Sequence, residues 1–330
     1  MIDSNHRVAD TAALLDDRLG ARLQRDVPLA PLTTYRVGGR AALFVDAESV
    51  GDLADIARAR ATTGVPVLVI GRGSNMLVAD AGFQGLVVSV ARFAGDITFD
   101  IESSQVVSGG GVALPVLARR TAAASLTGFE WAVGVPGSVG GAVRMNAGGH
   151  GSDIAASLLD IDVFDFDVPG LDDCLTRTIL ATDIGLRFRA SSLAPQVVVL
   201  SARLQLRPGN REDSEREISD IVRWRRDHQP GGQNCGSVFV NPVPGEVTAG
   251  GLIDSLGLRG VKVGSAWVSE KHANFIQAGD GGTAADVRAT IELVRQRVAA
   301  STGYLLRSEV RLVGFDDADP LSFDDGALAP

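Results

Sequence analysis

Two glycine-rich loops carry the residue types that could hold an anionic ligand. The first is Gly71-Arg72-Gly73-Ser74-Asn75, which directly follows 65–70, an apolar run typical of a buried strand. The second lies within 128–151. Glycine allows positive φ and close backbone approach, and successive N–H groups in such loops can form an anion-binding nest. Two simple tight turns are the alternative, but embedded side-chain donors favour a pyrophosphate cradle: Ser74, Asn75, Ser138 and Asn146.

The motifs exclude two common nucleotide-binding folds. Neither loop contains G-x-G-x-x-G, the dinucleotide fingerprint of a Rossmann domain, and neither contains the P-loop pattern G-x-x-x-x-G-K-[ST]. The cradle therefore belongs to another kind of nucleotide or cofactor site.

Other residues could act on a substrate. Arg189 stands beside two serines, Ser237 follows a glycine at the start of an apolar run, and Glu309 lies in an apparent strand. Lys271 and His272 precede another strand. Taken singly, each also fits an ordinary turn or surface position. Ser237 lacks the G-x-S-x-G frame of a nucleophile elbow, and the four histidines lack metal-ligand spacing.

Composition narrows the class of protein. The chain has 330 residues, is 45% hydrophobic and 22% charged, and carries a net charge of −9, which is ordinary for a globular protein of two or three domains. The acidic balance argues against nucleic acid as a partner. Two distant cysteines fit a reducing compartment. Without a signal peptide or an apolar run of membrane-spanning length, we expect a cytoplasmic protein with no membrane insertion.

The elements that must position these residues alternate between helices and strands, which predicts an α+β fold. Ser49 with Asp52, and Thr283 with Asp286, resemble capping boxes at two helix starts. Apolar periodicity predicts helices over 8–25, 49–62, 114–125, 211–226, 248–256 and 283–300. Strands are predicted over 42–45, 65–70, 85–90, 97–99, 105–108, 158–166, 196–206, 274–277 and 304–313.

Four motifs together resemble one family. Taken in chain order, they are L-V-I-G-R-G-S-N at 68–75, G-V-P-G-S-V-G-G at 134–141, G-S-V-F-V-N-P at 236–242 and S-E-V-R at 308–311. This series resembles the UDP-N-acetylenolpyruvoylglucosamine reductase (MurB) family over roughly residues 28–314.

The resemblance implies a flavoenzyme of peptidoglycan synthesis. Its fold would be the FAD-binding fold of the vanillyl-alcohol oxidase/CO-dehydrogenase flavoprotein type in two subdomains, 28–64 and 65–207. A C-terminal α+β domain, 208–314, would bind the UDP-sugar. A helical extension, 1–27, would precede them and a disordered acidic tail, 315–330, would follow.

The implied cofactor is non-covalent FAD, with NADPH as co-substrate, in a monomer. NADPH reduces the FAD, and flavin N5 then delivers hydride to the enolpyruvyl group of UDP-N-acetylglucosamine enolpyruvate. The product is UDP-N-acetylmuramate.

The resemblance assigns roles residue by residue. Ser237 is the implied proton donor, and Arg189 and Glu309 stabilise the enolate-like intermediate. If Glu309 donates a hydrogen bond it must be protonated, so we expect burial to raise its pKa. The implied FAD contacts are Tyr35, Arg36, Gly71, Arg72, Gly73, Ser74, Asn75, Met76, Gly134, Val135, Pro136, Gly137, Ser138, Gly140, Gly141, Asn146, Ala147 and Gly148. The implied substrate contacts are Arg225, Asn241, Lys271 and His272.

The chain departs from the family pattern at two places. Tyr35 and Tyr304 are its only tyrosines, so the chain resembles the branch that lacks a substrate-covering tyrosine loop. Phe188 stands before Arg189, where relatives often have tyrosine. Two rival functions remain open. One is a flavin oxidase of the same fold that holds its flavin through His150, and the other is a non-catalytic nucleotide-sugar sensor.

Overall fold

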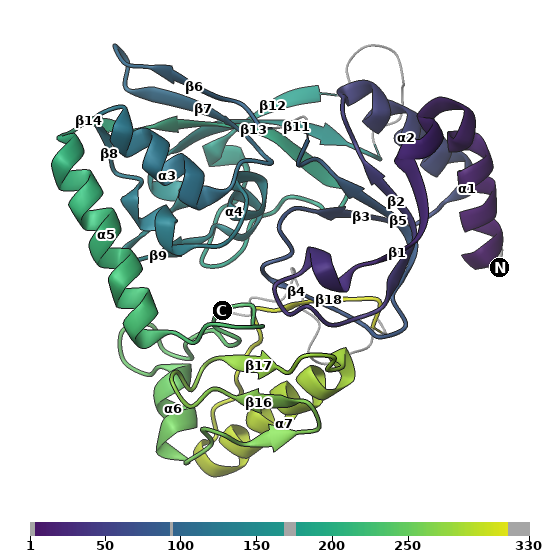
Figure 1. The fold of residues 1–330 in the computed structure, drawn as a ribbon. Helices are drawn as coiled ribbons and strands as arrows, with labels where there is room; N and C mark the ends of the chain where they lie inside the picture. Colours follow the sequence, from purple (N-terminus) through teal and green to yellow (C-terminus); the bar gives the residue numbers. More distant parts are fainter. Residues whose placement is uncertain (1–3, 93–94, 168–175, 316–330) are drawn as a thin grey trace. The chain divides into compact units, whose positions relative to one another are not determined.

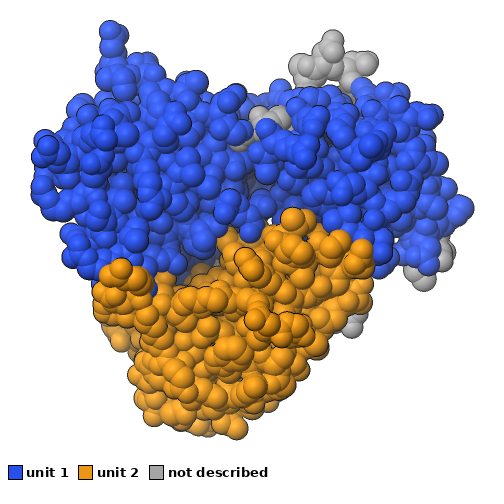
Figure 2. All heavy atoms as spheres, viewed as in Figure 1, with its two compact units in different colours: residues 1–27, 42–72, 84–225 blue, residues 28–41, 73–83, 226–330 orange. Residues whose placement is uncertain are grey.

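The computed structural model describes residues 4–92, 95–167 and 176–315 (Figure 1). The chain divides into two compact units, each made of several stretches of sequence (Figure 2). The first comprises 1–27, 42–72 and 84–225, and the second 28–41, 73–83 and 226–330. The predicted acidic tail lies, apart from Phe315, outside the described residues. The predicted domain boundary near residue 208 stays a prediction.

A four-stranded sheet forms one part of the first unit, in the order β1-β2-β5-β3. Its strands are β1 (Leu23–Pro28), β2 (Arg40–Asp46), β5 (Phe83–Ser89) and β3 (Val67–Ile70). Helices α1 (Ser4–Leu19) and α2 (Val50–Thr63) contact each other and share an apolar core with these strands. Helix α2 connects β2 to β3, β3 is parallel to β5, and the chain leaves β3 directly into the glycine loop at Gly71.

A five-stranded antiparallel sheet forms the other part, in the order β12-β11-β13-β7-β6 (Figure 1). Its strands are β12 (Thr176–Leu180), β11 (Leu158–Asp165), β13 (Val197–Gln205), β7 (Gln105–Gly109) and β6 (Ile97–Asp100). Helices α3 (Leu114–Ala123) and α4 (Val139–Met145) and the 3₁₀ turn η3 (Glu130–Gly134) share the core of this sheet.

Helix α5 (Arg211–His228) is joined to η3 by a buried carboxylate. Glu130 is 4% exposed and accepts from Ser214 Oγ at 2.6 Å, Thr127 Oγ1 at 2.8 Å and the Gly128 N–H at 2.8 Å. Burial by itself would raise the pKa of Glu130, but these hydrogen bonds, the one from Ser214 foremost, outweigh it and leave the pKa lowered. Two short ladders, β8 (Leu126–Thr127) with β14 (Arg207–Pro208) and β9 (Gly148–Gly149) with β10 (Ser152–Asp153), complete this region.

The second unit is built around α7 (Ala284–Thr302) and a three-stranded antiparallel sheet. The strands are β15 (Lys262–Val263), β16 (Ala266–Val268) and β17 (Ile276–Ala278), and α6 (Ala249–Ser255) also contacts α7. A separate parallel ladder joins β4 (Met76–Val78) to β18 (Arg311–Val313). The Asp80 carboxylate accepts from two N–H groups at the start of α7, at 2.8 and 2.9 Å, where the helix dipole favours a negative charge.

Several predicted elements are confirmed. Ser49 and Thr283 cap α2 and α7 by accepting from the N–H groups of Asp52 and Asp286. The predicted α+β content is present throughout both units.

Three predictions of elements are wrong. The helix predicted over 8–25 ends at Leu19, because Gly20 adopts a left-handed φ of 54° and the chain turns into β1. The strand predicted over 304–313 is regular only over β18. The loop predicted over 134–141 ends in a short helix, α4, which was not predicted because glycine has a low helix propensity.

Candidate active site residues in two units

The two predicted glycine loops meet within the first unit. A Cβ added at Gly71 would lie 2.5 Å from Ser138 Oγ, so only glycine allows this approach. Ser138 caps α4 by accepting from the Gly141 N–H. Gly140 is less crowded, since a Cβ there would lie 3.2 Å from Gly110 O, and its N–H bonds to that same oxygen at 2.8 Å. Gly71 and Ser138 therefore bring the start of the first loop against the second loop within the first unit, and the predicted FAD cradle stays a prediction.

The donors on the two loops fit an anionic cofactor. Among the described residues, the N–H groups of Arg72 and Gly137 have no hydrogen-bond acceptor, and neither does the exposed Arg72 guanidinium. Val135 and Pro136, beside them, are at least partly exposed. Backbone donors from two loops and one cation suit the pyrophosphate of a dinucleotide such as FAD.

The Asn146 side chain is buried and hydrogen-bonded within the protein. It ends α4 in the left-handed conformation, with φ 38°, and is 5% exposed. Its Nδ2 donates to Asp153 Oδ2 at 3.1 Å and Arg187 O at 3.2 Å, and its Oδ1 accepts from the Ala155 N–H at 3.1 Å. With its amide committed in this way, the side chain has little capacity left for a cofactor.

The next two predicted FAD contacts, Ala147 and Gly148, follow directly. The Ala147 N–H bonds to Ala142 O at 2.8 Å. A Cβ at Gly148 would lie 2.5 Å from Ser152 O, so the β9–β10 ladder requires glycine there. These positions can offer a ligand main-chain atoms only.

Arg189 lies at the tip of a tight turn. Arg187 and Ala190 exchange two backbone hydrogen bonds, at 3.0 and 3.1 Å, so Phe188 and Arg189 form the two-residue bend. Arg189 has a φ of 57°, which disfavours a residue with a Cβ by about 1 kcal/mol. Its guanidinium lies 5.4 Å from the centre of the exposed Phe188 ring.

Helix α4 supports this turn. The Arg144 guanidinium donates to Leu193 O and Ala194 O at 3.0 and 3.1 Å, and the Arg144 carbonyl accepts from Ser191 Oγ at 2.7 Å. The helix that begins at the predicted FAD loop thus ends by holding residues 191–194, which directly follow the turn of the predicted catalytic arginine. No motif in the sequence marks Arg144, because its partners are about fifty residues further along the chain.

Two basic side chains, those of His150 and Arg225, meet beside Gly134 in the first unit. A Cβ there would lie 3.2 Å from His150 Nε2 and 3.3 Å from Arg225 Cδ, and the His150 ring stands edge-on to Trp224 at 5.2 Å. Burial lowers the pKa of Arg225, and burial followed by the charge of Arg225 lowers the pKa of His150. Arg225 has no acidic partner among the described residues, which leaves it suited to a ligand's phosphate.

The second unit carries the remaining predicted FAD contacts near the chain's first loop. A Cβ at Gly73 would lie 2.2 Å from Leu32 O, and the Thr34 N–H bonds to Gly73 O at 3.2 Å. Tyr35 is wholly buried, with its hydroxyl facing Cys235, whereas Arg36 is exposed with a φ of 53°. Tyr35 therefore belongs to the core of this unit.

Burial and the neighbouring Cys235 raise the pKa of Tyr35, and burial raises the pKa of the Cys235 thiol to about 12. Both groups are neutral at physiological pH. Cys235 accordingly has the character of an inert core residue.

Asn75 connects the first glycine loop to Glu309. Its Nδ2 donates to Glu309 O at 2.9 Å, and its own carbonyl accepts from the Arg311 N–H at 3.0 Å. Met76 begins β4 beside it, and Ser74 has no hydrogen-bond partner among the described residues. The side chain of Asn75 thus holds the main chain of a predicted catalytic residue.

Ser237 and Glu309 lie on paired segments of the second unit. The Glu309 N–H bonds to Val238 O at 2.7 Å, and the Val240 N–H bonds to Arg307 O at 3.0 Å. Ser237 is partly buried, and its hydroxyl has no hydrogen-bond partner among the described residues. A hydroxyl without an internal partner, on a hydrogen-bonded segment, can form a hydrogen bond to a ligand.

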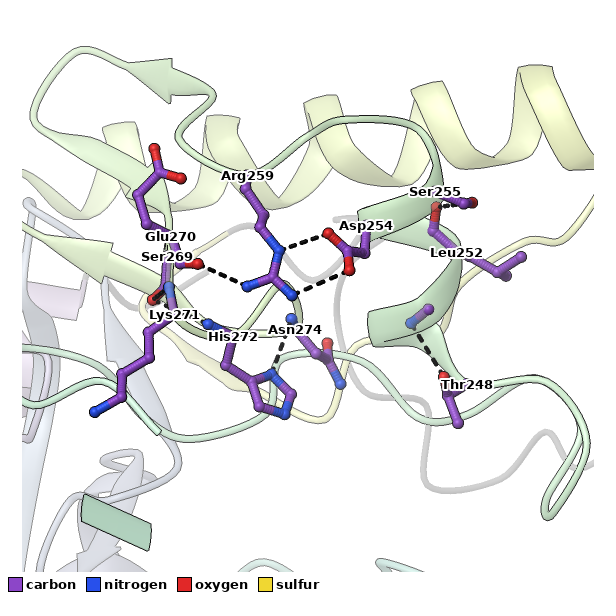
Figure 3. Close-up of polar contacts among 11 residues, drawn as sticks. Thr248, Leu252, Asp254, Ser255, Arg259, Ser269, Glu270, Lys271, His272 and Asn274 are labelled. Carbon is purple, nitrogen blue, oxygen red and sulfur yellow. Dashed lines mark hydrogen bonds and ion pairs between the residues drawn. The ribbon is translucent and has the colours of Figure 1, made fainter. Parts of the chain in front are cut away.

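The predicted substrate contacts in the second unit differ in which of their polar atoms already bond within the protein. Asn241 Oδ1 accepts from the Ala249 N–H at 3.1 Å, which fixes the start of α6. The Lys271 ammonium donates to Arg226 O. His272 Nδ1 accepts from the Asn274 N–H at 3.2 Å (Figure 3), so the ring is held as the tautomer with hydrogen on Nε2.

Burial, and next the nearby Arg259, lower the pKa of His272. Arg259 is itself held by both carboxylate oxygens of Asp254 and by Glu270 O (Figure 3). His272 is therefore neutral at pH 7 and offers an Nε2–H donor.

Two kinds of structural feature are absent from the described residues. No cluster of three metal-ligating side chains occurs within 4–92, 95–167 and 176–315. Over the same described residues, no helix combines the length and the apolar character needed to span a bilayer.

Comparisons with known proteins agree with this architecture. Residues 41–167 match the FAD binding domain family, and residues 228–313 match the family described as UDP-N-acetylenolpyruvoylglucosamine reductase, C-terminal domain. These two domains define a flavoprotein with a C-terminal domain of the reductase type, and FAD is its cofactor.

Curated relatives and a solved structure make the family specific. The reductase of Heliobacterium modesticaldum is 41% identical over 90% of this chain and 92% of its own, and that of Synechococcus sp. strain CC9311 is 42% identical over 90% and 95%. The crystal structure of MurB from Thermus caldophilus superposes with a TM-score of 0.73 at 32% identity, covering 88% of this chain and 99% of that one. The chain belongs to the UDP-N-acetylenolpyruvoylglucosamine reductase family.

Membership confirms the predicted fold class, the FAD cofactor and the oxidoreductase class. The roles given to individual residues stay predictions, as do their distances from one another across the two units.

Proposed function

We propose that this protein uses NADPH to reduce the enolpyruvyl group of UDP-N-acetylglucosamine enolpyruvate, forming UDP-N-acetylmuramate. The carbon–carbon double bond gains a hydride at its terminal carbon and a proton at the carbon next to the carboxylate. Bound FAD supplies reversible two-electron chemistry, so that NADPH and the sugar nucleotide can react in turn. The chain's own residues must bind both partners, stabilise charge and deliver the proton.

The free hydroxyl of Ser237 is the observation that supports this proposal most. Its Oγ has no partner among the described residues, although the next residue, Val238, is hydrogen-bonded on both sides. Serine is a weak acid, but the carbon it must protonate is enolate-like and strongly basic. A fixed hydroxyl therefore suffices as the proton donor, and solvent restores its proton afterwards.

Arg189 and Glu309 would stabilise the charge that develops on the substrate carboxylate. The interaction of a guanidinium with that carboxylate is stronger in the transition state than in the ground state, so it lowers the barrier to reduction. The strained φ of Arg189 supports a functional role, because strained residues are retained mainly where function needs them. Glu309 would act as a protonated hydrogen-bond donor, in the neighbourhood of the neutral Cys235 thiol.

Binding roles follow from the donors that each unit offers. In the first unit, the loops that meet at Gly71 and Ser138 would hold the FAD pyrophosphate, and Arg225 would bind a substrate phosphate. In the second, His272 would donate through Nε2 to the UDP-sugar, with Lys271 and Asn241 shaping the surrounding loop. We further propose that the enzyme acts as a monomer in the cytoplasm, where NADPH and sugar nucleotides are made.

Stopped-flow absorbance near 450 nm tests the proposal by separating the two half-reactions. Anaerobic NADPH should bleach the flavin band of the holoenzyme, and UDP-N-acetylglucosamine enolpyruvate should then restore it rapidly. Ser237→Ala should bleach at the wild-type rate and recover at least about 10²-fold more slowly, as expected for loss of a positioned proton donor. Wild-type enzyme that bleaches but does not recover with this substrate would refute the proposal, and rapid recovery with oxygen instead would favour an oxidase.

A further inference from the structure

Asn274 pairs with the main chain just after Ser237 in the way a neighbouring strand would. Its side chain Oδ1 accepts from the Phe239 N–H at 3.0 Å, and its Nδ2 donates to Phe239 O at 2.8 Å. Its own carbonyl accepts from the Val238 N–H at 2.9 Å. Asn274 is 5% exposed, so these bonds are shielded from water and the amide orientation is fixed by its partners.

The same segment is held on its other flank. Val238 O accepts from the Glu309 N–H at 2.7 Å, and Phe239 forms a β-bridge with Ser308. The peptide that follows Ser237 is therefore bonded to Asn274 on one side and to the Glu309 segment on the other. The Ser237 hydroxyl, by contrast, has no hydrogen-bond partner among the described residues.

Asn274 is itself rigidly supported. Its N–H bonds to His272 Nδ1 at 3.2 Å (Figure 3). The Phe275 N–H bonds to His272 O at 3.0 Å. Ser269, which is 1% exposed, accepts from the N–H groups of Lys271 and His272 through its Oγ. Asn274 can thus transmit a fixed geometry to the segment it binds.

We propose that Asn274 is the positioning residue of Ser237, setting the direction of the serine hydroxyl without touching substrate or cofactor. This inference rests on the proposed role of Ser237 as proton donor. Proton transfer is sensitive to position, and a misplacement of about 1 Å can slow a reaction about 10²-fold. Flavin reduction by NADPH does not use Ser237, so only the second half-reaction should depend on Asn274.

The test uses the FAD-loaded enzyme and the two half-reactions followed at 450 nm. Asn274→Ala removes both side-chain bonds to Phe239. We expect flavin reduction by NADPH to stay within about twofold of wild type and reoxidation by UDP-N-acetylglucosamine enolpyruvate to slow about 10²-fold. Thr290→Val is the matched control, because Thr290 is also fully buried in the second unit and donates to Asp286 O at 2.8 Å. It should lose stability and keep both rates.

Asn274→Asp gives a readout that a purely structural role would not move, and it serves also if the alanine variant fails to fold. An ionised aspartate can accept from Phe239 N–H but repels Phe239 O, whereas a protonated one can again donate. Its reoxidation rate, divided by that of wild type at each pH, should therefore rise as the pH is lowered. Taking the ratio removes the titrations that both enzymes share, and His272, whose Nδ1 accepts from the N–H of residue 274, is the neighbouring titratable group.

Three results would overturn the inference. The first is an equal slowing of both half-reactions in Asn274→Ala. The second is a reoxidation rate of Asn274→Ala that is no lower than that of Thr290→Val. The third is a ratio of the Asn274→Asp and wild-type reoxidation rates that does not change with pH. A Ser237→Ala enzyme that reoxidises normally would instead overturn the proposed proton donor, and the positioning role with it.

Discussion

Gly71→Ala is a one-carbon change whose effect can be worked out from a single contact. Gly71 does not have a left-handed φ, so the backbone accepts alanine. The new Cβ would lie 2.5 Å from Ser138 Oγ but 3.6 Å from Ser138 Cβ, so the overlap is with the hydroxyl alone. Ordinary contact begins at 3.4 Å, so the hydroxyl must move by about 0.9 Å, the difference between 3.4 and 2.5 Å.

Moving that hydroxyl breaks the cap of α4. Loss of a serine N-cap costs about 0.5–2 kcal/mol, and the Ser138–Gly141 bond is long at 3.4 Å, which places the cost near the lower end. We expect Gly71→Ala to lower the free energy of unfolding by about 0.5–1 kcal/mol. If the displaced hydroxyl also contacts FAD, 1 kcal/mol of lost binding would weaken FAD affinity about fivefold.

Urea unfolding of the apoprotein and fluorescence titration with FAD measure the two quantities. The control is the double-mutant cycle with Ser138→Ala, which removes the overlapping hydroxyl. In that background Gly71→Ala should be neutral or slightly stabilising, since alanine restricts the unfolded chain. If Gly71→Ala costs the same with and without the serine hydroxyl, the contact between the two loops is not the cause and the reasoning fails.

Two further predictions follow from strained or buried groups. Ser214→Ala should cost about 1.5–3 kcal/mol at pH 7, because it removes a hydrogen bond to the ionised Glu130. The lowered pKa of Glu130 means that this contribution is present above the unfolded-state pKa and is lost as pH falls through the folded-state value. Urea unfolding should therefore show a smaller loss at acidic pH, and an equal loss at both pH values would contradict the assignment. Arg189→Gly removes about 1 kcal/mol of left-handed strain, so it should unfold at no lower urea concentration than wild type while flavin reoxidation slows at least about 10²-fold. An Arg189→Gly variant that is both less stable and fully active would refute the proposal that the strained φ of Arg189 serves catalysis.

Local sequence signals predicted the elements that depend on local physics. The caps at Ser49 and Thr283 and the apolar stripe of α7 follow from spacing within one or two turns. The first helix was extended too far because Leu23 continues its apolar period, although Gly20 turns the chain into β1 and Leu23 is buried there as a strand residue. Periodicity alone cannot distinguish these two ways of burying one leucine.

The sequence predicts which residue types the candidate site contains, but not the side chains that hold those residues in place. The glycine loops pointed to a cofactor cradle, and the resemblance pointed to Ser237, Glu309 and Arg189. The amide partners of Asn274, Asn75 and Asn146 could not be foreseen, because each holds a segment far away in the sequence. Asn75 and Asn146 are predicted FAD contacts, and their side chains donate to the main chain of Glu309 and Arg187.

The second unit is assembled from stretches of chain that are synthesised at very different times. β4 ends at Val78 and its partner β18 begins at Arg311, so 311 − 78 − 1 = 232 residues separate them. At usual translation rates, this interval lasts on the order of 10–50 seconds. During it the apolar Leu77, fully buried in the finished fold, has no β18 to pair with. A nascent chain should therefore bind holding chaperones through this early segment. Any chain terminated before β18 should leave the second unit unfolded, however complete the first one is.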